Sequence, residues 1–224
     1  MDEGFFCKGL NMAQEYIKED LRKSDRIYAN RLRTQILEEF YLDNLVPKAY
    51  IYTLCNNNTI RLIFDINQFC YLLGFSYFGY NGILGWDSLH DKNISISQLY
   101  DIANHRQEEI RITSFPKILN ILDNPTMYLY ENKNMRYKSD YFAVWNDGKR
   151  YYKLGIGTTS NGVNYGETYQ VSLINSKDNQ EIDPSKLLTV NHTSIISKED
   201  LHFPIHIATK EQKNKRGNLS NEEK

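Results

Sequence analysis

Histidine is the residue type in this sequence whose spacing comes nearest to that of a metal site. His202 and His206 are four residues apart, a spacing that places two imidazoles on one face of a helix. Pro204 lies between them and would break such a helix, so we expect a loop with two unrelated histidines. The other three histidines stand alone in the sequence: His90, His105 and His192. Their separation indicates single polar groups.

Cysteine and glycine give no sign of a cofactor or metal site either. The three cysteines, Cys7, Cys55 and Cys70, are widely spaced, and none belongs to a Cys-x-x-Cys pair. Such a pattern suits neither a disulfide framework nor a zinc site, and it is typical of a reducing compartment. The sequence also lacks a glycine-rich phosphate-binding loop and a nucleophile elbow. We therefore expect no cofactor, no metal ion and a cytoplasmic location.

Overall composition excludes several classes of protein. The chain has 224 residues, with 27 Lys and Arg against 28 Asp and Glu, which gives a formal charge of -1. This balance excludes a chain that coats a long nucleic-acid duplex, so any contact with nucleic acid must be local. A hydrophobic fraction of 41% excludes an intrinsically disordered chain. No apolar run approaches the roughly 18 to 20 residues of a membrane span, and the acidic start lacks the features of a secretory signal. We therefore expect no membrane contact.

The elements that must position any functional residues begin with a helix and a hairpin. Between residues 10 and 41, apolar residues recur at four-residue steps, which predicts an amphipathic helix with a candidate break at Ser24-Asp25. Residues 49–54 and 59–64 are apolar runs separated by Asn56-Asn57-Asn58. Asparagine tolerates the left-handed backbone of a tight turn, so these runs predict a β-hairpin.

A short capped helix is predicted directly after the hairpin. Asp65, followed three residues later by Gln68, has the pattern of a capping box. The apolar run that follows ends at Gly74, a residue suited to the left-handed end of a helix. Together these features predict a helix over residues 66–73.

The middle of the chain is expected to hold a loop and further helices. Residues 75–91 carry three glycines beside Trp86 and predict a shaped loop. A capped helix is expected over 95–103. Helical structure over 108–122 is expected in two pieces, because Pro116 fits only the first turn of a helix.

Strand patterns return in the last part of the chain. The predicted strands are residues 127–130, 141–145, 151–156 and 168–174. Asp147-Gly148 between two of them is a strong hairpin pattern, so we expect an antiparallel meander. The fold class is therefore α+β, with helices packed against an antiparallel sheet. We divide the chain into an N-terminal helical segment (1–44), an α+β domain (45–208) and a disordered charged tail (209–224).

Several short motifs resemble those of a phage nuclease-like family that is grouped with barnase, EndoU, the tRNase colicins and RelE, the fourth of its phage members. The matching segments are Tyr50-Ile51-Tyr52-Thr53-Leu54, Arg61-Leu62-Ile63-Phe64, Phe69-Cys70-Tyr71-Leu72-Leu73-Gly74-Phe75, Arg111-Ile112-x-x-Phe115, Ser139-Asp140-Tyr141 and 169–174. The resemblance covers roughly residues 45–180. It implies a hairpin, a short helix, a helical middle and an antiparallel sheet.

The reaction that the resemblance implies is metal-independent cleavage of RNA, with tRNA as one candidate substrate. The ribose 2′-hydroxyl attacks the adjacent phosphate, which requires a base, a cation and an acid. The resemblance implies Arg111 as a phosphate clamp and His105 with Arg106 as acid/base and cation. Hydroxyl groups on the late strand are candidate phosphate donors: Thr168, Tyr169 and Ser172. An arginine near Glu108 and Glu109 equally suits a surface ion pair, so this alternative stays open for Arg111.

One position departs from the family pattern. The family has histidine in its helix motif, where this sequence has Tyr71. A phenol, with an unperturbed pKa of about 10, is a poor base unless a cation lies nearby. Tyr71 is therefore either a substitute catalytic group or a core aromatic residue.

Aromatic residues in the predicted loop could recognise the substrate. Unpaired RNA bases stack on exposed aromatic rings, and Tyr77, Tyr80 and Trp86 lie in the glycine-containing stretch. The alternative is that these rings fold the loop onto the core.

Two functions remain open at this point. The first is a ribonuclease of the toxin or phage-conflict type, which acts on RNA and has an antitoxin as a candidate partner. The second is an inactive nuclease-like fold that binds and inhibits a host defence protein. If Asp101, Asp140 and Glu167 crowd the cleft, phosphate would be repelled and the second function would be favoured.

Overall fold

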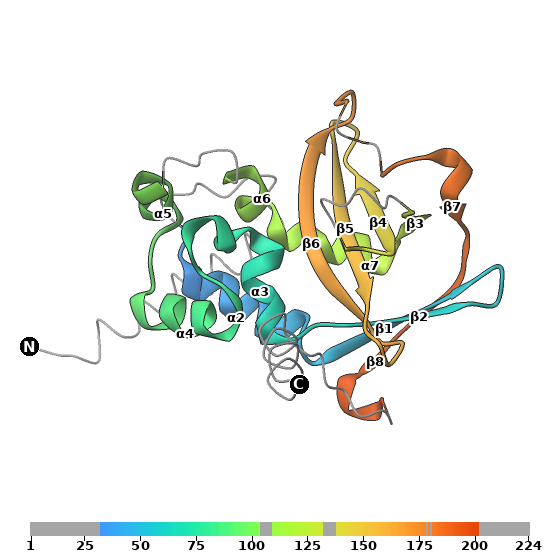
Figure 1. Cartoon of the computed structure of the whole chain (residues 1–224), viewed down its shortest axis with the longest axis horizontal. Helices are drawn as coiled ribbons and strands as arrows, with labels where there is room; N and C mark the ends of the chain where they lie inside the picture. The colour runs from blue at the N-terminus through green and yellow to red at the C-terminus, as the bar shows by residue number, and fades with distance from the viewer. Residues whose placement is uncertain (1–31, 104–108, 132–137, 178, 180, 202–224) are drawn as a thin grey trace, which may run out of the picture.

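The computed structural model describes residues 32–103, 109–131, 138–177, 179 and 181–201. Figure 1 shows a group of helices beside a twisted sheet, with the helices contributed mainly by the first half of the chain. The expected α+β class is therefore confirmed. No helix in these ranges is long and apolar enough to cross a membrane.

One sheet of eight strands runs through the molecule, in the order β7-β3-β4-β5-β6-β2-β1-β8. Its strands are β1 (Lys48–Leu54), β2 (Thr59–Ile63), β3 (Thr126–Leu129), β4 (Tyr141–Asn146), β5 (Arg150–Thr158), β6 (Asn164–Leu173), β7 (Leu187–Leu188) and β8 (Val190–Ser197). The expected meander β3-β4-β5-β6 is confirmed.

The sheet is not purely antiparallel, which corrects the expectation for its strand pairing. β2 and β6 pair in parallel through Leu62 opposite Asn164 and Ile63 opposite Tyr165. The chain between these two strands runs through the helices and the rest of the meander, and a parallel pair requires such a long crossover. This pair joins the N-terminal hairpin to the meander.

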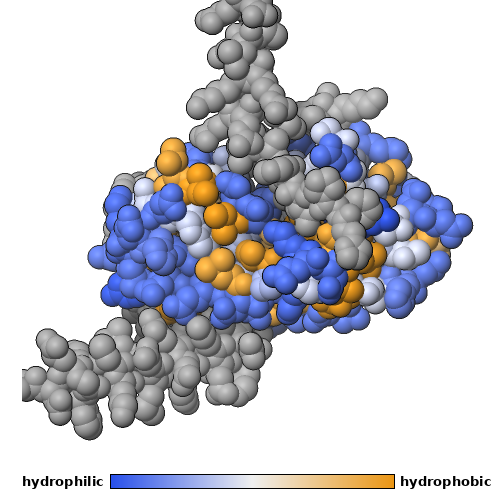
Figure 2. All heavy atoms as spheres, turned by 90° about the horizontal axis from the view of Figure 1, so that it is seen from below, coloured by the Kyte–Doolittle hydropathy of each residue, from blue (hydrophilic) through white to orange (hydrophobic). Residues whose placement is uncertain are grey.

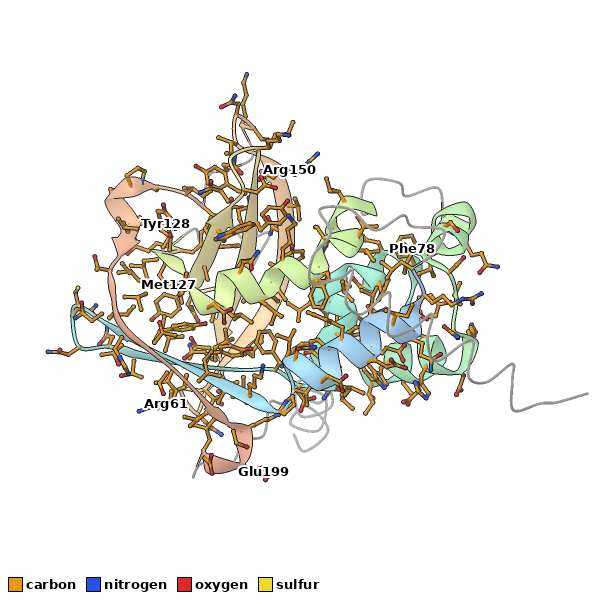
Figure 3. All side chains as sticks on the ribbon, turned by 180° about the vertical axis from the view of Figure 1, so that it is seen from behind. Arg61, Phe78, Met127, Tyr128, Arg150 and Glu199 are labelled. Carbon is orange, nitrogen blue, oxygen red and sulfur yellow. The ribbon has the colours of Figure 1, made fainter. Side chains whose placement is uncertain are left out.

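The helices lie on one side of the sheet and beside β6, the last strand of the meander (Figure 1). They are α2 (Thr34–Asn44), α3 (Ile66–Leu73), α4 (Gly82–Lys92), α5 (Ile96–Ala103), α6 (Glu109–Thr113) and α7 (Ile118–Asp123), with 3₁₀ turns η1 (Phe75–Phe78), η3 (Phe115–Lys117), η4 (Pro184–Lys186) and η5 (Lys198–Asp200). Figure 3, seen from behind, shows α7 lying across the strands of the meander. The opposite face of the meander is therefore not covered by α7.

Local patterns explain the hairpin and helix α3. Asn57 adopts a left-handed backbone with φ 64° in the turn between β1 and β2. The Asp65 side chain accepts a hydrogen bond from the Asn67 backbone N–H, and the Gln68 side chain accepts one from the Asp65 N–H. Gly74 ends the helix with φ 76°. The predicted hairpin, capping box and terminal glycine are all confirmed.

The prediction of a loop over residues 75–91 is wrong, because this stretch forms η1 and helix α4. Gly85 allows α4 to pack closely, since a Cβ atom there would lie 2.5 Å from the Tyr80 carbonyl carbon and 3.1 Å from Cys70 Sγ. Only Gly79 and Gly82, which have positive φ, serve the turn between the two elements. Two of the three glycines therefore mark a turn, and the third marks a close contact between elements.

The expected helical pieces on either side of Pro116 are confirmed. Ser95 and Gln98 hydrogen-bond to each other at the start of α5, as a capping box requires. Further on, α6 ends at Thr113 and Pro116 lies in the first turn of η3, which leads into α7. This short break matters for function, because it orients α6 toward β6.

Helix α2 shares the core of the sheet domain. Leu37 and Tyr41 are fully buried, and the Tyr41 hydroxyl donates to the Asp65 carbonyl oxygen at 2.7 Å. The Tyr41 ring also lies near Phe69 and Phe115, at centroid distances of 5.3 and 6.4 Å. The rest of the predicted helix over 10–41, including Ser24-Asp25, lies outside the described residues, as does the predicted tail over 209–224.

Strands β7 and β8 were not anticipated from the sequence. β8 pairs along the outer edge of β1, with Lys48 opposite Ser197 and Thr53 opposite His192. Its side chains are mostly half-buried or exposed, so the run lacks the strong apolar pattern by which a strand is recognised. In Figure 3, Arg61 and Glu199 lie at this end of the molecule, far from Arg150 at the hairpin of the meander.

Candidate active site

Arg111 joins three elements at the edge of the meander. From α6, its guanidinium donates through Nε to the Leu72 carbonyl oxygen at 2.9 Å and through Nη2 to the Tyr71 carbonyl oxygen at 2.7 Å. Nη2 also donates to Thr168 Oγ1 on β6 at 3.3 Å. The side chain thus bonds to two carbonyl groups in the last turn of α3, where the backbone N–H groups of the helix run out; the Tyr71 oxygen also accepts the N–H of Gly74. Arg111 is only 9% exposed, so its side chain is buried and does not lie on the surface.

A β-bulge in β6 shapes the face of the sheet beside Arg111. Gly155 of β5 pairs with Thr168, and the next residue, Ile156, pairs with Gly166. Glu167 is therefore the extra residue of the bulge, without an opposite partner on β5. In a regular strand, successive side chains point to opposite faces of the sheet, and a bulge disturbs this alternation. The side chains of the neighbours Glu167 and Thr168 can therefore lie on the same face.

Ser139 connects the two neighbouring residues of the bulge. Its hydroxyl donates to Glu167 Oε2 at 2.7 Å, and the Lys138 backbone N–H donates to Glu167 Oε1 at 3.0 Å. A Cβ atom on Gly155 would lie 2.4 Å from Ser139 Oγ and 2.8 Å from Thr168 Cγ2. The side chains of Ser139 and Thr168 therefore share the space over this glycine.

We call Arg111, Ser139, Glu167 and Thr168 the Arg111 site. It combines a guanidinium, which suits phosphate, with a carboxylate that can accept a proton and two hydroxyls that can donate hydrogen bonds. Glu167 is half-buried, and Asp140 is exposed next to Ser139. Of the three acids that could repel phosphate, Glu167 therefore lies in the site itself, and the side chain of Asp101 lies outside the described part of the chain.

Ser172 lies further along the same face of β6. In the pairing of β5 and β6, Gly155 is opposite Thr168, Lys153 is opposite Gln170 and Tyr151 is opposite Ser172, so Thr168, Gln170 and Ser172 share one face. The Ser172 hydroxyl donates to Asn179 Oδ1 at 2.5 Å. The structure does not bring Ser172 into the Arg111 site, because Ser172 lies four positions beyond Thr168 along the extended strand.

Tyr169 faces the opposite side of the sheet and lies in the core. Its hydroxyl donates to the Ser114 carbonyl oxygen at 2.8 Å, and its ring packs edge-on against Phe115 at 5.6 Å. Burial raises the pKa of this phenol far above its usual range. Because the side chain is fully buried, the expectation that Tyr169 donates to a phosphate is wrong.

Of the three remaining candidates for proton transfer, the structure describes Tyr71 but not His105 or Arg106. Tyr71 is half-buried in the last turn of α3, and its carbonyl oxygen accepts the bond from Arg111. His105 and Arg106 lie outside the described residues. Among the described residues, Tyr71 therefore reaches the Arg111 site through its carbonyl oxygen.

The three aromatic candidates for base stacking have different environments. Trp86 is 8% exposed and packs edge-on against Phe69 at 4.8 Å, so the expectation that it stacks on a base is wrong. Tyr80 is half-buried against the core, with Lys92 Nζ 5.5 Å from its ring centroid. Tyr77 is 54% exposed and is accessible on η1.

A second polar pair lies between helices α2 and α4. His90 Nδ1 is 2.9 Å from Glu38 Oε2, and the Glu38 side chain is buried whereas that of His90 is largely exposed. Burial raises the pKa of Glu38, and the hydrogen bond to Glu38 raises that of His90. His90 is thus an exposed polar group, in agreement with the prediction, and its bond to Glu38 links α4 to α2. Within the described ranges, no three His, Cys, Asp or Glu side chains are grouped as metal ligands.

Sequence reasoning missed the role of Glu167. The motif Ser139-Asp140-Tyr141 pointed to the correct part of the chain, but Glu167 was considered only as a group that would repel phosphate. The predicted strand began at residue 168, whereas β6 begins at Asn164. A bulge depends on how two strands pair, so no pattern within one strand could have found it.

Comparison with known families agrees with the resemblance of the short motifs. A family model described as phage-Barnase-EndoU-ColicinE5/D-RelE like nuclease 4 matches residues 35–215. The match extends beyond residues 45–180 at both ends and includes all residues of the Arg111 site. Neither a curated protein nor a solved structure matches the chain.

Proposed function

Because the chain belongs to the phage-Barnase-EndoU-ColicinE5/D-RelE like nuclease 4 family, we propose that it cleaves RNA without a metal ion. In this reaction the ribose 2′-oxygen bonds to the adjacent phosphorus and the bond from phosphorus to the 5′-oxygen breaks. The products are a 2′,3′-cyclic phosphate and a 5′-hydroxyl. The family match supports nuclease chemistry, and the Arg111 site supports this form of it.

The observation that carries the proposal is the bulge that allows Glu167 and Thr168 to share one face of β6. Arg111 is bonded to Thr168, and Ser139 is bonded to Glu167, so a cation and a carboxylate flank a pair of hydroxyls. A phosphate seated over the two hydroxyls would have a cation on one side and a proton acceptor on the other. These groups supply the base and the cation that attack by a 2′-hydroxyl requires.

Each residue of the Arg111 site has a role in this proposal. Glu167 takes the proton of the 2′-hydroxyl, and Arg111 stabilises the negative charge that develops on the phosphorane. The Thr168 hydroxyl donates to a phosphate oxygen, and the Ser139 hydroxyl positions Glu167 by donating to its Oε2 atom. Tyr71 and His105 are the candidates for the acid that protonates the leaving 5′-oxygen.

The proposal is tested by incubating the purified protein with cellular RNA and tRNA in EDTA and analysing the fragment ends. The control is the Arg111→Ala, Glu167→Gln double variant, purified in the same way, because contaminating ribonucleases would act equally in both samples. Fragments with 2′,3′-cyclic ends that only the unaltered chain produces would support the proposal. Intact RNA, from protein shown to be folded, would contradict it.

A second candidate function is favoured by two observations. Tyr71 stands at the position where the motif resemblance implies a histidine, and the Arg111 guanidinium donates to two backbone carbonyl groups. Such a fold could act as an inactive protein that binds an antitoxin or inhibits a host defence enzyme. Exposed apolar residues would suit this function, and they include Tyr77, Ile83 and Leu84. Figure 2 shows one face on which hydrophobic residues gather between hydrophilic ones.

A further inference from the structure

Gln170 occupies the centre of the polar face of β6. It lies two residues beyond Thr168 and two residues before Ser172, so roughly 7 Å of extended strand separates it from each. On β5, the residue opposite Gln170 is Lys153. The Arg111 site and Gln170 therefore lie next to each other on one side of the meander.

The side-chain amide of Gln170 has a donor that is unpaired in the part of the chain that the structure describes. Its Nε2 atom is buried and has no hydrogen-bond partner among the residues that the structure describes. Most buried polar atoms in proteins have a partner, because leaving one unpaired removes the bonds it would make to water. An unpaired donor beside a candidate catalytic site is therefore suited to a ligand.

The positive charge of Lys153, which lies opposite Gln170, is balanced by the carboxylate of Glu181. Lys153 is only 1% exposed, and its Nζ donates to Glu181 Oε2 at 2.9 Å and to Asn179 Oδ1 at 3.4 Å. The same Asn179 oxygen accepts the bond from Ser172. The lysine is thus paired with a carboxylate, which makes this part of the face less attractive to a phosphate than the Arg111 site. A neutral polar group suits it better.

A nucleobase is the neutral polar group that an RNA substrate would place beside its phosphate. A glutamine amide offers one donor and one acceptor side by side, and adenine presents the complementary acceptor and donor on its edge. Single-stranded RNA can expose these edges to side chains. The phosphate attached to that nucleotide would then lie at Arg111, which bonds to Thr168, two residues before Gln170 on β6.

We propose that Gln170 recognises the base next to the scissile phosphate and gives the nuclease a preference for adenine at that position. This inference rests on the proposed function, because it assigns substrate specificity to the same face of the sheet. It adds a residue that contacts the base and takes no part in the bond-breaking step.

The test compares the unaltered chain with Gln170→Met, which keeps the length of the side chain and removes both hydrogen-bonding groups. Gln35→Met is the matched control, because it makes the same chemical change on α2, away from the meander. Each protein cleaves a set of RNA oligonucleotides that differ only in the base next to the cleavage site. Melting temperatures of all three proteins show whether the variants are folded.

We expect the unaltered chain and Gln35→Met to prefer adenine by about tenfold or more, and Gln170→Met to lose that preference while still cleaving. Cleavage by all three proteins with the same preference would overturn this inference and leave the proposed function intact. Absence of both cleavage and binding of RNA by the unaltered chain would overturn the proposed function and this inference together.

Discussion

The Arg111 guanidinium is bonded to the backbone of Tyr71, with Nη2 2.7 Å from the Tyr71 carbonyl oxygen. Tyr71 is the position at which the motif resemblance implies a histidine, and this bond joins that position to the cation of the Arg111 site. Because Arg111 also bonds to Leu72 and Thr168, one side chain holds together α3, α6 and β6. Arg111 therefore has a structural role, which is to hold these elements together, and a proposed chemical role, which is to bind the phosphate. Experiments must measure the two separately.

Replacing Arg111 by alanine should reduce both stability and cleavage. The change removes the hydrogen bonds from the guanidinium to the Leu72 and Tyr71 carbonyl oxygens, although the Tyr71 oxygen keeps the bond from the Gly74 N–H, and it should cost about 1 to 3 kcal/mol of unfolding free energy. Arg111→Lys should recover part of the stability and little of the cleavage, since lysine keeps the charge and loses the planar fork. Denaturant unfolding and cleavage assays measure the two effects.

The control for this pair is Lys149→Ala, which removes an exposed cation at the far hairpin of the meander. It should leave both stability and cleavage within about a factor of two. Cleavage by Arg111→Ala at the rate of this control would remove Arg111 from the mechanism.

Glu167→Gln should abolish most of the cleavage without unfolding the protein. The amide keeps the shape of the side chain and cannot take a proton, so the rate should fall by roughly 10² to 10⁴. The matched control is Asp140→Asn, the same change at an exposed neighbour of Ser139, which should cleave nearly normally. Rate measurements across pH add a second test, because the acidic limb of the profile should disappear only in Glu167→Gln. Equal rates in the two variants would exclude Glu167 as the base.

Asp147 should make the protein more stable at neutral pH than at strongly acidic pH. Burial raises the pKa of this carboxyl, but bonds from the Tyr152 hydroxyl and from the backbone of Arg150 and Lys149 outweigh burial and lower it to about 2. The stabilisation is therefore complete above the usual pKa of about 4 and is lost as the pH falls through 2.

Asp147→Asn should measure this contribution. Because water screens the exposed residue, we expect a loss of about 1 kcal/mol at pH 7 and a much smaller difference near pH 2. Unfolding by denaturant at the two pH values provides the comparison. An equal difference at both values would show that the charge of Asp147 does not stabilise the fold.

The pair of His90 and Glu38 predicts a pH dependence of its own. The hydrogen bond to Glu38 and its charge raise the pKa of His90 above 6.5. The stabilisation from this pair is complete below pH 6.5 and is lost as the pH rises through the raised pKa. In Glu38→Gln, the His90 pKa measured by NMR titration should return toward its usual value. An unchanged pKa would mean that the two side chains are not paired in solution.

Local sequence patterns were sufficient where the determinants lie close together in the chain. Asp65, Gln68 and Gly74 fix helix α3 through bonds that span only a few residues, and the asparagine turn and Asp147-Gly148 fix two hairpins in the same way. The meander follows from its alternating strands and turn residues. Each of these elements could be predicted without knowledge of the rest of the fold.

Tertiary contacts decided the features that the sequence could not reveal. Gly85 resembles a loop residue until Tyr80 and Cys70 are packed against it. Arg111 resembles a surface residue until α6 is placed against the end of α3. Glu167 acquires its place beside Ser139 only through the register of β5 and β6, which one strand alone does not encode.

The most direct test of the central claim uses a DNA oligonucleotide that contains a single ribonucleotide, incubated with the protein in EDTA. Attack by a 2′-hydroxyl is possible only at that nucleotide. We predict one cut, on its 3′ side, with a 2′,3′-cyclic phosphate on one fragment and a 5′-hydroxyl on the other. Cleavage at deoxynucleotides, or cleavage of RNA only when a divalent metal is added, would contradict the proposed mechanism.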